Sequence, residues 1–248
     1  MTGSASTSWK HYQTGRSGSR RFDCDSLKVS ANADSTLSTI TYIGAEENAS
    51  SVVAFQPTVL KGLGYTSSGA QVHSIPIYIV AFVLSLVCAW LSEHFRQRYF
   101  FSLLGSLITL IGLAIELAQP RAAGARYLGM FFLTTGSYIV MPIQVVWLAI
   151  NIGKGYKRTV AFGMVIAVGN CGAFISSNVF ITQQAPVYRT GFSVGLGMNM
   201  LSMVSMTVMY IGLRLENIRR DKKQSDTAHV PLSEEASGEK HPDFRYRL

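Results

Sequence analysis

Residues 127–153 read YLGMFFLTTGSYIVMPIQVVWLAINIG and contain no Asp, Glu, Lys or Arg. The hydrocarbon core of a bilayer is ~30 Å thick, and a helix of roughly 20 mostly apolar residues crosses it. Backbone amides in lipid must be hydrogen bonded within their own segment, so a stretch of this kind is predicted to be a helix. The sequence therefore predicts an all-α membrane protein.

Further charge-free stretches lie on both sides of this one, at residues 62–92, 99–115, 159–188 and 190–213. Each is long enough to span a membrane, because the charged flanks of the shortest one can reach the interface. An additional stretch, 48–60, is shorter and contains Pro57. We expect a polytopic transmembrane domain over residues 46–213 with six helices, of which the first is incomplete.

The two ends of the chain differ from this domain in composition. Residues 1–45 are rich in Ser, Thr, Gly and Asn, which predicts a disordered region. Residues 214–248 are predicted to form a polar tail. The net charge is +8, but the basic residues fall between the spans, so they indicate topology and not a nucleic-acid partner. More of them lie on the side that holds both ends, which predicts that both termini are cytoplasmic.

Polar side chains inside membrane helices are costly and turn toward other helices or a water-filled cavity. Six of them are candidates for the polar wall of a substrate cavity: Tyr78, Gln144, Trp147, Asn151, Asn170 and Asn178. For any one residue of the fourth span, and for Asn170, a packing contact between helices is the favoured interpretation. Pro142 supports the substrate interpretation for the fourth span, because interrupted helices mark binding sites in transporters.

Other patterns predict packing. Gly169, Gly172, Gly191 and Gly195 are small residues at which helices can approach closely. The span 99–118 is apolar on nearly all sides and is predicted to face lipid.

Glu116, at the end of that span, is either a proton site or a carboxylate that reaches the interface, and the second interpretation is favoured. The methionines of the last span are interpreted as an apolar surface, not a metal site. No phosphate-loop or nucleophile motif is present, so we expect no enzyme activity, no cofactor and no metal.

The loop that follows the second span reads SEHFRQR over residues 92–98. Its Glu93, Arg96 and Arg98 resemble the acid–arginine loop of the major facilitator superfamily, in which such loops latch helix ends in one conformation. The alternative is a positively charged cytoplasmic loop with an incidental acid.

Several segments resemble one family of that superfamily, the fungal allantoate-permease-like transporters, also called anion:cation symporters. The similarity covers about residues 52–248. It lies in Phe55-Gln56-Pro57-Thr58 with Lys61–Tyr65, Pro76 with Tyr78–Phe82, Trp147 with Asn151 and Lys157-Arg158, Gly169-Asn170 with Gly172, Ala185-Pro186 with Tyr188-Arg189, and Pro242–Tyr246.

This resemblance implies the C-terminal six-helix half of a twelve-helix fold, in which each half is built from inverted three-helix repeats. It implies uptake of small organic anions such as allantoate, ureidosuccinate or nicotinate-like carboxylates, by alternating access with proton symport at the plasma membrane. The implied partners are the lipid bilayer, the anion, a proton and an N-terminal half.

The predicted spans contain no Lys or Arg and no central Asp or Glu. Charged groups for the substrate and the proton are therefore expected from the other half. The alternative function is that of a non-transporting six-helix membrane protein that associates with full-length transporters.

Overall fold

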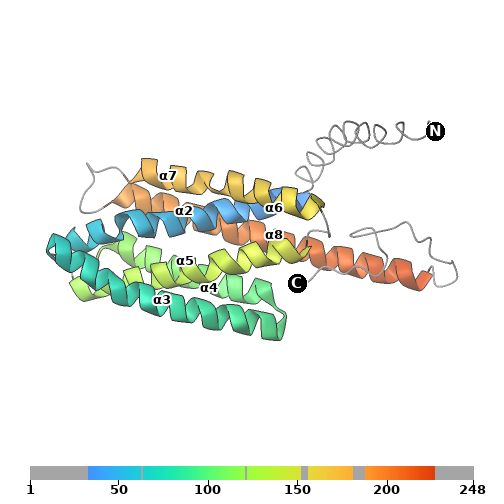
Figure 1. Cartoon of the computed structure of the whole chain (residues 1–248), viewed down its shortest axis with the longest axis horizontal. Helices are drawn as coiled ribbons and strands as arrows, with labels where there is room; N and C mark the ends of the chain where they lie inside the picture. Colours follow the sequence, from blue (N-terminus) through green and yellow to red (C-terminus); the bar gives the residue numbers. More distant parts are fainter. Residues whose placement is uncertain (1–32, 63, 121, 152–155, 181–187, 227–248) are drawn as a thin grey trace, which may run out of the picture.

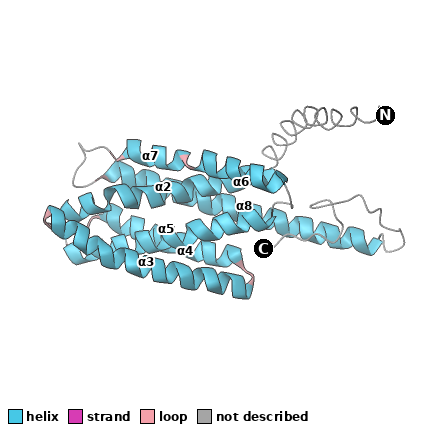
Figure 2. Ribbon diagram, in the orientation of Figure 1, coloured by secondary structure: helices cyan, strands magenta, loops and turns pink. Residues whose placement is uncertain are grey.

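The computed structural model describes residues 33–62, 64–120, 122–151, 156–180 and 188–226, and these residues form a bundle of helices (Figure 2). The helices are α2 (Ala33–Gly62), α3 (Ser67–Phe95), α4 (Arg98–Ala118), α5 (Ala123–Asn151), α6 (Tyr156–Gly169), α7 (Cys171–Val179) and α8 (Arg189–Asp226). Their axes run along the long dimension of the molecule (Figure 1). The described part of the chain contains no strand, which confirms the all-α fold class.

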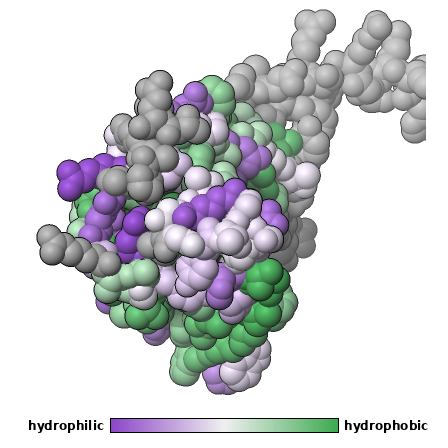
Figure 3. Space-filling model, turned by 90° about the vertical axis from the view of Figure 1, so that its left-hand side faces the viewer, coloured by the Kyte–Doolittle hydropathy of each residue, from purple (hydrophilic) through white to green (hydrophobic). Residues whose placement is uncertain are grey.

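The helices of the described chain are long and apolar enough to cross a membrane in five places: Ser67–Phe95, Arg98–Ala118, Ala123–Asn151, Phe162–Val179 and Arg189–Arg219. Seen from the end that carries the turn between α2 and α3, polar residues cover the end of the bundle. Apolar residues gather on its lower flank, where α3 lies in Figure 1 (Figure 3). This distribution suits a bundle that has this flank in lipid and this end in water.

Short turns join the first helices. The Oγ1 of Thr66 accepts a hydrogen bond from the backbone N–H of Gly69 at 3.2 Å and caps the start of α3. Arg96 and Gln119 adopt left-handed backbone conformations with φ of 54° and 47°, which end α3 and α4. The helices α2 to α5 therefore run antiparallel in succession, whereas α6 and α7 run in the same direction, and α2 begins at the same end of the bundle at which α8 leaves it (Figure 1).

Two helices, α2 and α5, connect the halves of the bundle. α2 packs against α6, α7 and α8, and α5 packs against α3 and α4, while α2 also contacts α5. The helices form two successive groups, α2–α4 and α5–α8, in which α6 and α7 together make one span. The first helix of each group thus packs on the later helices of the other group. This reciprocal arrangement is the one expected for paired three-helix repeats.

The first helix begins earlier than predicted, and this corrects the boundary at residue 46. α2 starts at Ala33 and has 30 residues, so residues 33–45 are helical and the helix is of full length. Its buried side chains Thr41, Ala45, Asn48 and Val52 follow a helical period. Small and polar residues occupy this face, so the segment has the composition of a disordered region although it packs as a helix.

The last helix ends later than predicted. α8 continues to Asp226, so the predicted tail at 214–248 begins inside a helix. Residues 1–32 and 227–248, on which the remaining predictions for the two ends fall, lie outside the described residues.

The span 99–118 is not apolar on nearly all sides, although it exposes an apolar flank that includes Leu104, Leu107 and Ile111. α4 buries a continuous face of small and polar residues, Ser102, Gly105, Ser106, Thr109 and Gly112, and it packs closely against α5. Ser, Thr and Gly allow helix backbones to approach closely in lipid. Their helical spacing therefore indicates an interface between helices, which the high overall hydrophobicity of the span does not show.

Candidate functional site

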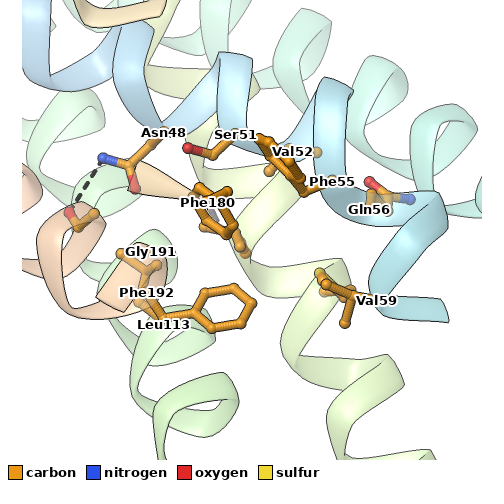
Figure 4. A pocket seen from close by; sticks show the side chains of 13 residues that line it. Asn48, Ser51, Val52, Phe55, Gln56, Val59, Leu113, Phe180, Gly191 and Phe192 are labelled. Atoms are coloured by element: carbon orange, nitrogen blue, oxygen red, sulfur yellow. Dashed lines mark hydrogen bonds between the residues drawn. The ribbon is translucent and has the colours of Figure 1, made fainter. Parts of the chain in front are cut away.

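A small cavity lies in the interior of the bundle, between α2, α4, α5 and α8 and the end of α7 (Figure 4). Its polar lining comes from Asn48, Ser51 and Gln56 of α2, and Phe180 and Phe192 contribute aromatic walls. Its volume is about 10 Å³, which is room for about one water molecule. An organic anion does not fit in this cavity.

Hydrogen bonds connect the polar lining to neighbouring helices. The Nδ2 of Asn48 donates to the backbone oxygen of Gly195 at 3.4 Å (Figure 4), and the hydroxyls of Ser51 and Ser176 lie 2.9 Å apart. The hydroxyl of Thr134 donates to the Oε1 of Gln56 at 3.2 Å. These bonds join α2 to α8, α7 and α5, so the lining also holds the bundle together.

Two of the predicted cavity residues, Gln144 and Trp147, lie in the core of the bundle. The Nε2 of Gln144 donates to the Oγ of Ser102 at 2.6 Å and contacts the sulfur of Met206 at 2.9 Å. Trp147 is fully buried against Met206 and its neighbours on α8. Both side chains pack between helices here, and their role in substrate binding stays a prediction.

The other four predicted residues do not converge on the cavity. Tyr78 is half-buried and stands edge-to-face with Tyr138 of α5, with ring centroids 5.9 Å apart. Asn151 is half-buried at the end of α5. Asn170, at the break between α6 and α7, and Asn178 are exposed, and the Nδ2 of Asn178 donates to the backbone oxygen of Phe174.

The glycines confirm the packing prediction. A Cβ at Gly172 would meet the backbone of α2 at Ile43, and one at Gly191 would lie 2.6 Å from the ring of Phe180. Such separations are shorter than any carbon contact that can be tolerated. The helices α7 and α8 therefore approach their neighbours at positions where only glycine fits.

The predicted latch loop forms an ion pair in the structure. Arg98, at the start of α4, binds the carboxylate of Glu93 at the end of α3, and the side chain of Arg98 is buried. Arg96 is exposed and ends α3 with its left-handed backbone. The pair joins the ends of two consecutive helices, and its action as a conformational latch stays a prediction.

Two buried carboxylates were missed or misplaced by the sequence reasoning. Glu116 is not exposed on the surface of the bundle: it is fully buried, and its Oε2 lies 3.4 Å from the Nε of Arg126. Glu47 lies fully buried near the middle of α2, which corrects the expectation that the spans hold no central acid. The helical period of Thr41, Ala45, Asn48 and Val52 would have placed it inside a helix.

Five helices in the described chain that are long and apolar enough to cross a membrane, together with polar residues over one end of the bundle, define a polytopic α-helical membrane protein. The chain is 29% identical over 214 residues to the high-affinity nicotinic acid transporter of Saccharomyces cerevisiae, covering 84% of this chain and 40% of that protein. It is 32% identical to the MFS-type transporter cnsO of Penicillium expansum, over 77% of this chain and 39% of that protein. The major facilitator-type transporter hxnP of Emericella nidulans is 28% identical over 78% of this chain and 40% of its own length.

No family model matches the chain, and no solved structure matches it. The chain is nevertheless a homologue of the major facilitator-type transporters, as the resemblance predicted. It spans about 40% of the length of the relatives it matches, and its all-α fold is consistent with one half of such a transporter.

Proposed function

We propose that this chain acts as the C-terminal half of a transporter for small organic anions, with nicotinate-like carboxylates as the substrate class. Allantoate and ureidosuccinate belong to the same chemical class. Transport would occur by alternating access between this half and a complementary half, with proton symport. The observation that carries the proposal is the similarity to the nicotinic acid transporter over 84% of the chain.

The chemistry of the described half supports a shared binding site. Its interior cavity holds about one water, so the anion would bind on a face of the bundle and not within it. Tyr78 and Tyr138 form a half-buried pair between α3 and α5, and their hydroxyls can donate to a carboxylate. Such donors orient an anion but do not neutralise it, so a cationic side chain is expected from the complementary half.

Uptake in a yeast strain that lacks its nicotinic acid transporter tests the proposal. The full chain is expressed with the amino-terminal half of that transporter, and uptake of labelled nicotinate is measured. The control is the same chain without the added half, which is expected to show no uptake above background.

Uptake by the pair, and its inhibition by other small carboxylates, is the expected result. If the two halves co-purify but no carboxylate tested is taken up, the transport proposal is wrong and the association function is favoured.

A further inference from the structure

A carboxyl group lies at the centre of the first helix, in a place where nothing neutralises it. The side chain of Glu47 is fully buried. Its Oε1 accepts a hydrogen bond from the hydroxyl of Ser51 at 3.2 Å, and its Oε2 has no hydrogen-bond partner among the described residues. α2 runs from Ala33 to Gly62, so the carboxyl lies about midway along a helix of the bundle.

Two glycines bring the neighbouring helices close to this carboxyl. A Cβ added to Gly195 of α8 would lie 3.6 Å from the Oε2 of Glu47 and 3.3 Å from the Oδ1 of Asn48. On α7, a Cβ added to Gly172 would lie 2.8 Å from the backbone nitrogen of Glu47. The backbones of α7 and α8 therefore lie close to the residue, and its side chain is inaccessible to solvent in this conformation.

The ionisable groups around Glu47 do not offer a compensating charge. Glu46 lies beside it in the sequence, half-buried, and its Oε1 accepts from Ser50 at 3.0 Å. Tyr42 of α2 and Tyr138 of α5 lie within electrostatic range of Glu46. Among the described residues, no basic side chain forms an ion pair with Glu47.

Glu116 shows the contrast within the same bundle, because its carboxylate is paired with Arg126. An isolated carboxylate in an apolar medium is far more costly than the neutral acid, so a buried acid without a partner is normally neutralised. For Glu47 the simplest neutralising ligand is a proton, since the close approach of α7 and α8 leaves it in contact with other helices.

We propose that Glu47 is the proton-binding site of this half, and the proposal rests on the proton-coupled transport proposed above. When α2 is closed against α7 and α8, the carboxylate holds one proton as the neutral acid. When this helix crossing opens to water, the acid releases that proton and the carboxylate becomes hydrated. The step forms and breaks a single O–H bond and requires no other reactant.

Infrared spectroscopy of the purified full chain in lipid nanodiscs tests the site without any transport. The absorption of protonated carboxyl groups is compared between mildly acidic and mildly alkaline pH for the native chain, Glu47→Gln and Glu47→Asp. Glu216→Gln is the matched control, because Glu216 lies near the end of α8, partly exposed and 4.0 Å from Arg219.

At neutral pH the native chain is expected to show the band of a protonated carboxyl that exchanges slowly with deuterium. Glu47→Gln should lose this band, Glu47→Asp should keep one shifted in frequency, and Glu216→Gln should leave it unchanged. Circular dichroism checks that each variant stays helical. A band that persists in folded Glu47→Gln, or that shifts when sodium is added, overturns the proposal.

A transport measurement separates this proposal from the proposed function. In the reassembled transporter, Glu47→Gln is expected to exchange labelled nicotinate for unlabelled nicotinate at a near-native rate. Its accumulation driven by an inward proton gradient should fall to the level seen without a gradient. Proton-driven accumulation by Glu47→Gln contradicts the site. If the native pair transports nothing, the proposed function fails, and the infrared result alone decides whether Glu47 holds a proton.

Discussion

Replacement of Gly112 by Ala should destabilise the bundle, although alanine is the better helix former. Gly112 lies on the buried face of α4 where that helix crosses α5. A Cβ there would lie 2.8 Å from the Cα of Leu133 and 2.8 Å from the backbone oxygen of Gly129. Both obstacles are backbone atoms, so no side-chain rotation can relieve the clash.

The size of the effect follows from these distances. Carbon atoms pack best at about 3.5–4.0 Å, so α4 and α5 must separate by about 1 Å. A gap of that size removes roughly a quarter to a half of each dispersion contact along the interface. Overpacking of this kind costs about 1–3 kcal/mol.

Gly197 offers a matched control. It lies in α8, and an added Cβ there would meet nothing within 4 Å. Its replacement by Ala should be neutral or should stabilise the helix by about 0.5–1 kcal/mol. Reversible unfolding in mixed lipid–detergent micelles, followed by tryptophan fluorescence, measures both variants. Equal unfolding free energies for Gly112→Ala and Gly197→Ala would refute the close packing of α4 on α5.

Three further predictions concern the polar and charged residues. Replacing Arg126 by Ala should lower the unfolding free energy by about 3–5 kcal/mol, because the charge of Glu116 is left unpaired. In a double-mutant cycle, the variant with both residues replaced by Ala should lose less stability than the sum of the losses of the two single variants. Replacing Gln144 by Ala should lower the unfolding free energy by about 0.6–1.7 kcal/mol through loss of its interhelical hydrogen bonds, whereas Trp147→Ala should lower it by about 3–5 kcal/mol. Equal losses of unfolding free energy in the same assay would contradict the packing of these two side chains. Replacing the exposed Asn178 by Ala should change stability by less than about 0.5 kcal/mol, so a raised KM for nicotinate with unchanged unfolding would indicate substrate contact, and unchanged KM would remove it from the site.

The membrane spans were predictable because long stretches of the chain contain no charged residues. This pattern does not depend on how the helices pack against one another. The start of α2 was not predictable from composition, since polar residues such as Thr41 and Asn48 form part of the buried face of this helix. The burial of Glu47 was missed for the same reason. A search for helical period among small and polar residues would have found both.

The candidate site was less accessible from sequence than the fold. Periodicity shows that Gln144 and Trp147 turn inward, but it does not distinguish a cavity from a neighbouring helix. In the structure both contact Met206 of α8. The polar lining of the interior cavity comes from α2, whose short charge-free stretch was interpreted as part of an incomplete helix.

The buried basic residues of the bundle also bear on the proposed pairing of two transporter halves. Among the described residues of the bundle, the buried basic side chains Arg98 and Arg126 are engaged with Glu93 and Glu116. Neither is offered to an anion in this conformation. Under the proposed function, a cation that pairs with the bound carboxylate inside the transporter is therefore expected from the complementary half.

The most direct test of the proposed function is the size of the native protein and the identity of the proteins that co-purify with it. The chain is tagged at its C-terminal end at its own locus, solubilised in mild detergent and analysed on a denaturing blot. The account predicts either a band near twice the calculated 27.1 kDa or a 27.1 kDa band that co-purifies with a second transporter half. A band at 27.1 kDa that co-purifies with no membrane partner would contradict it.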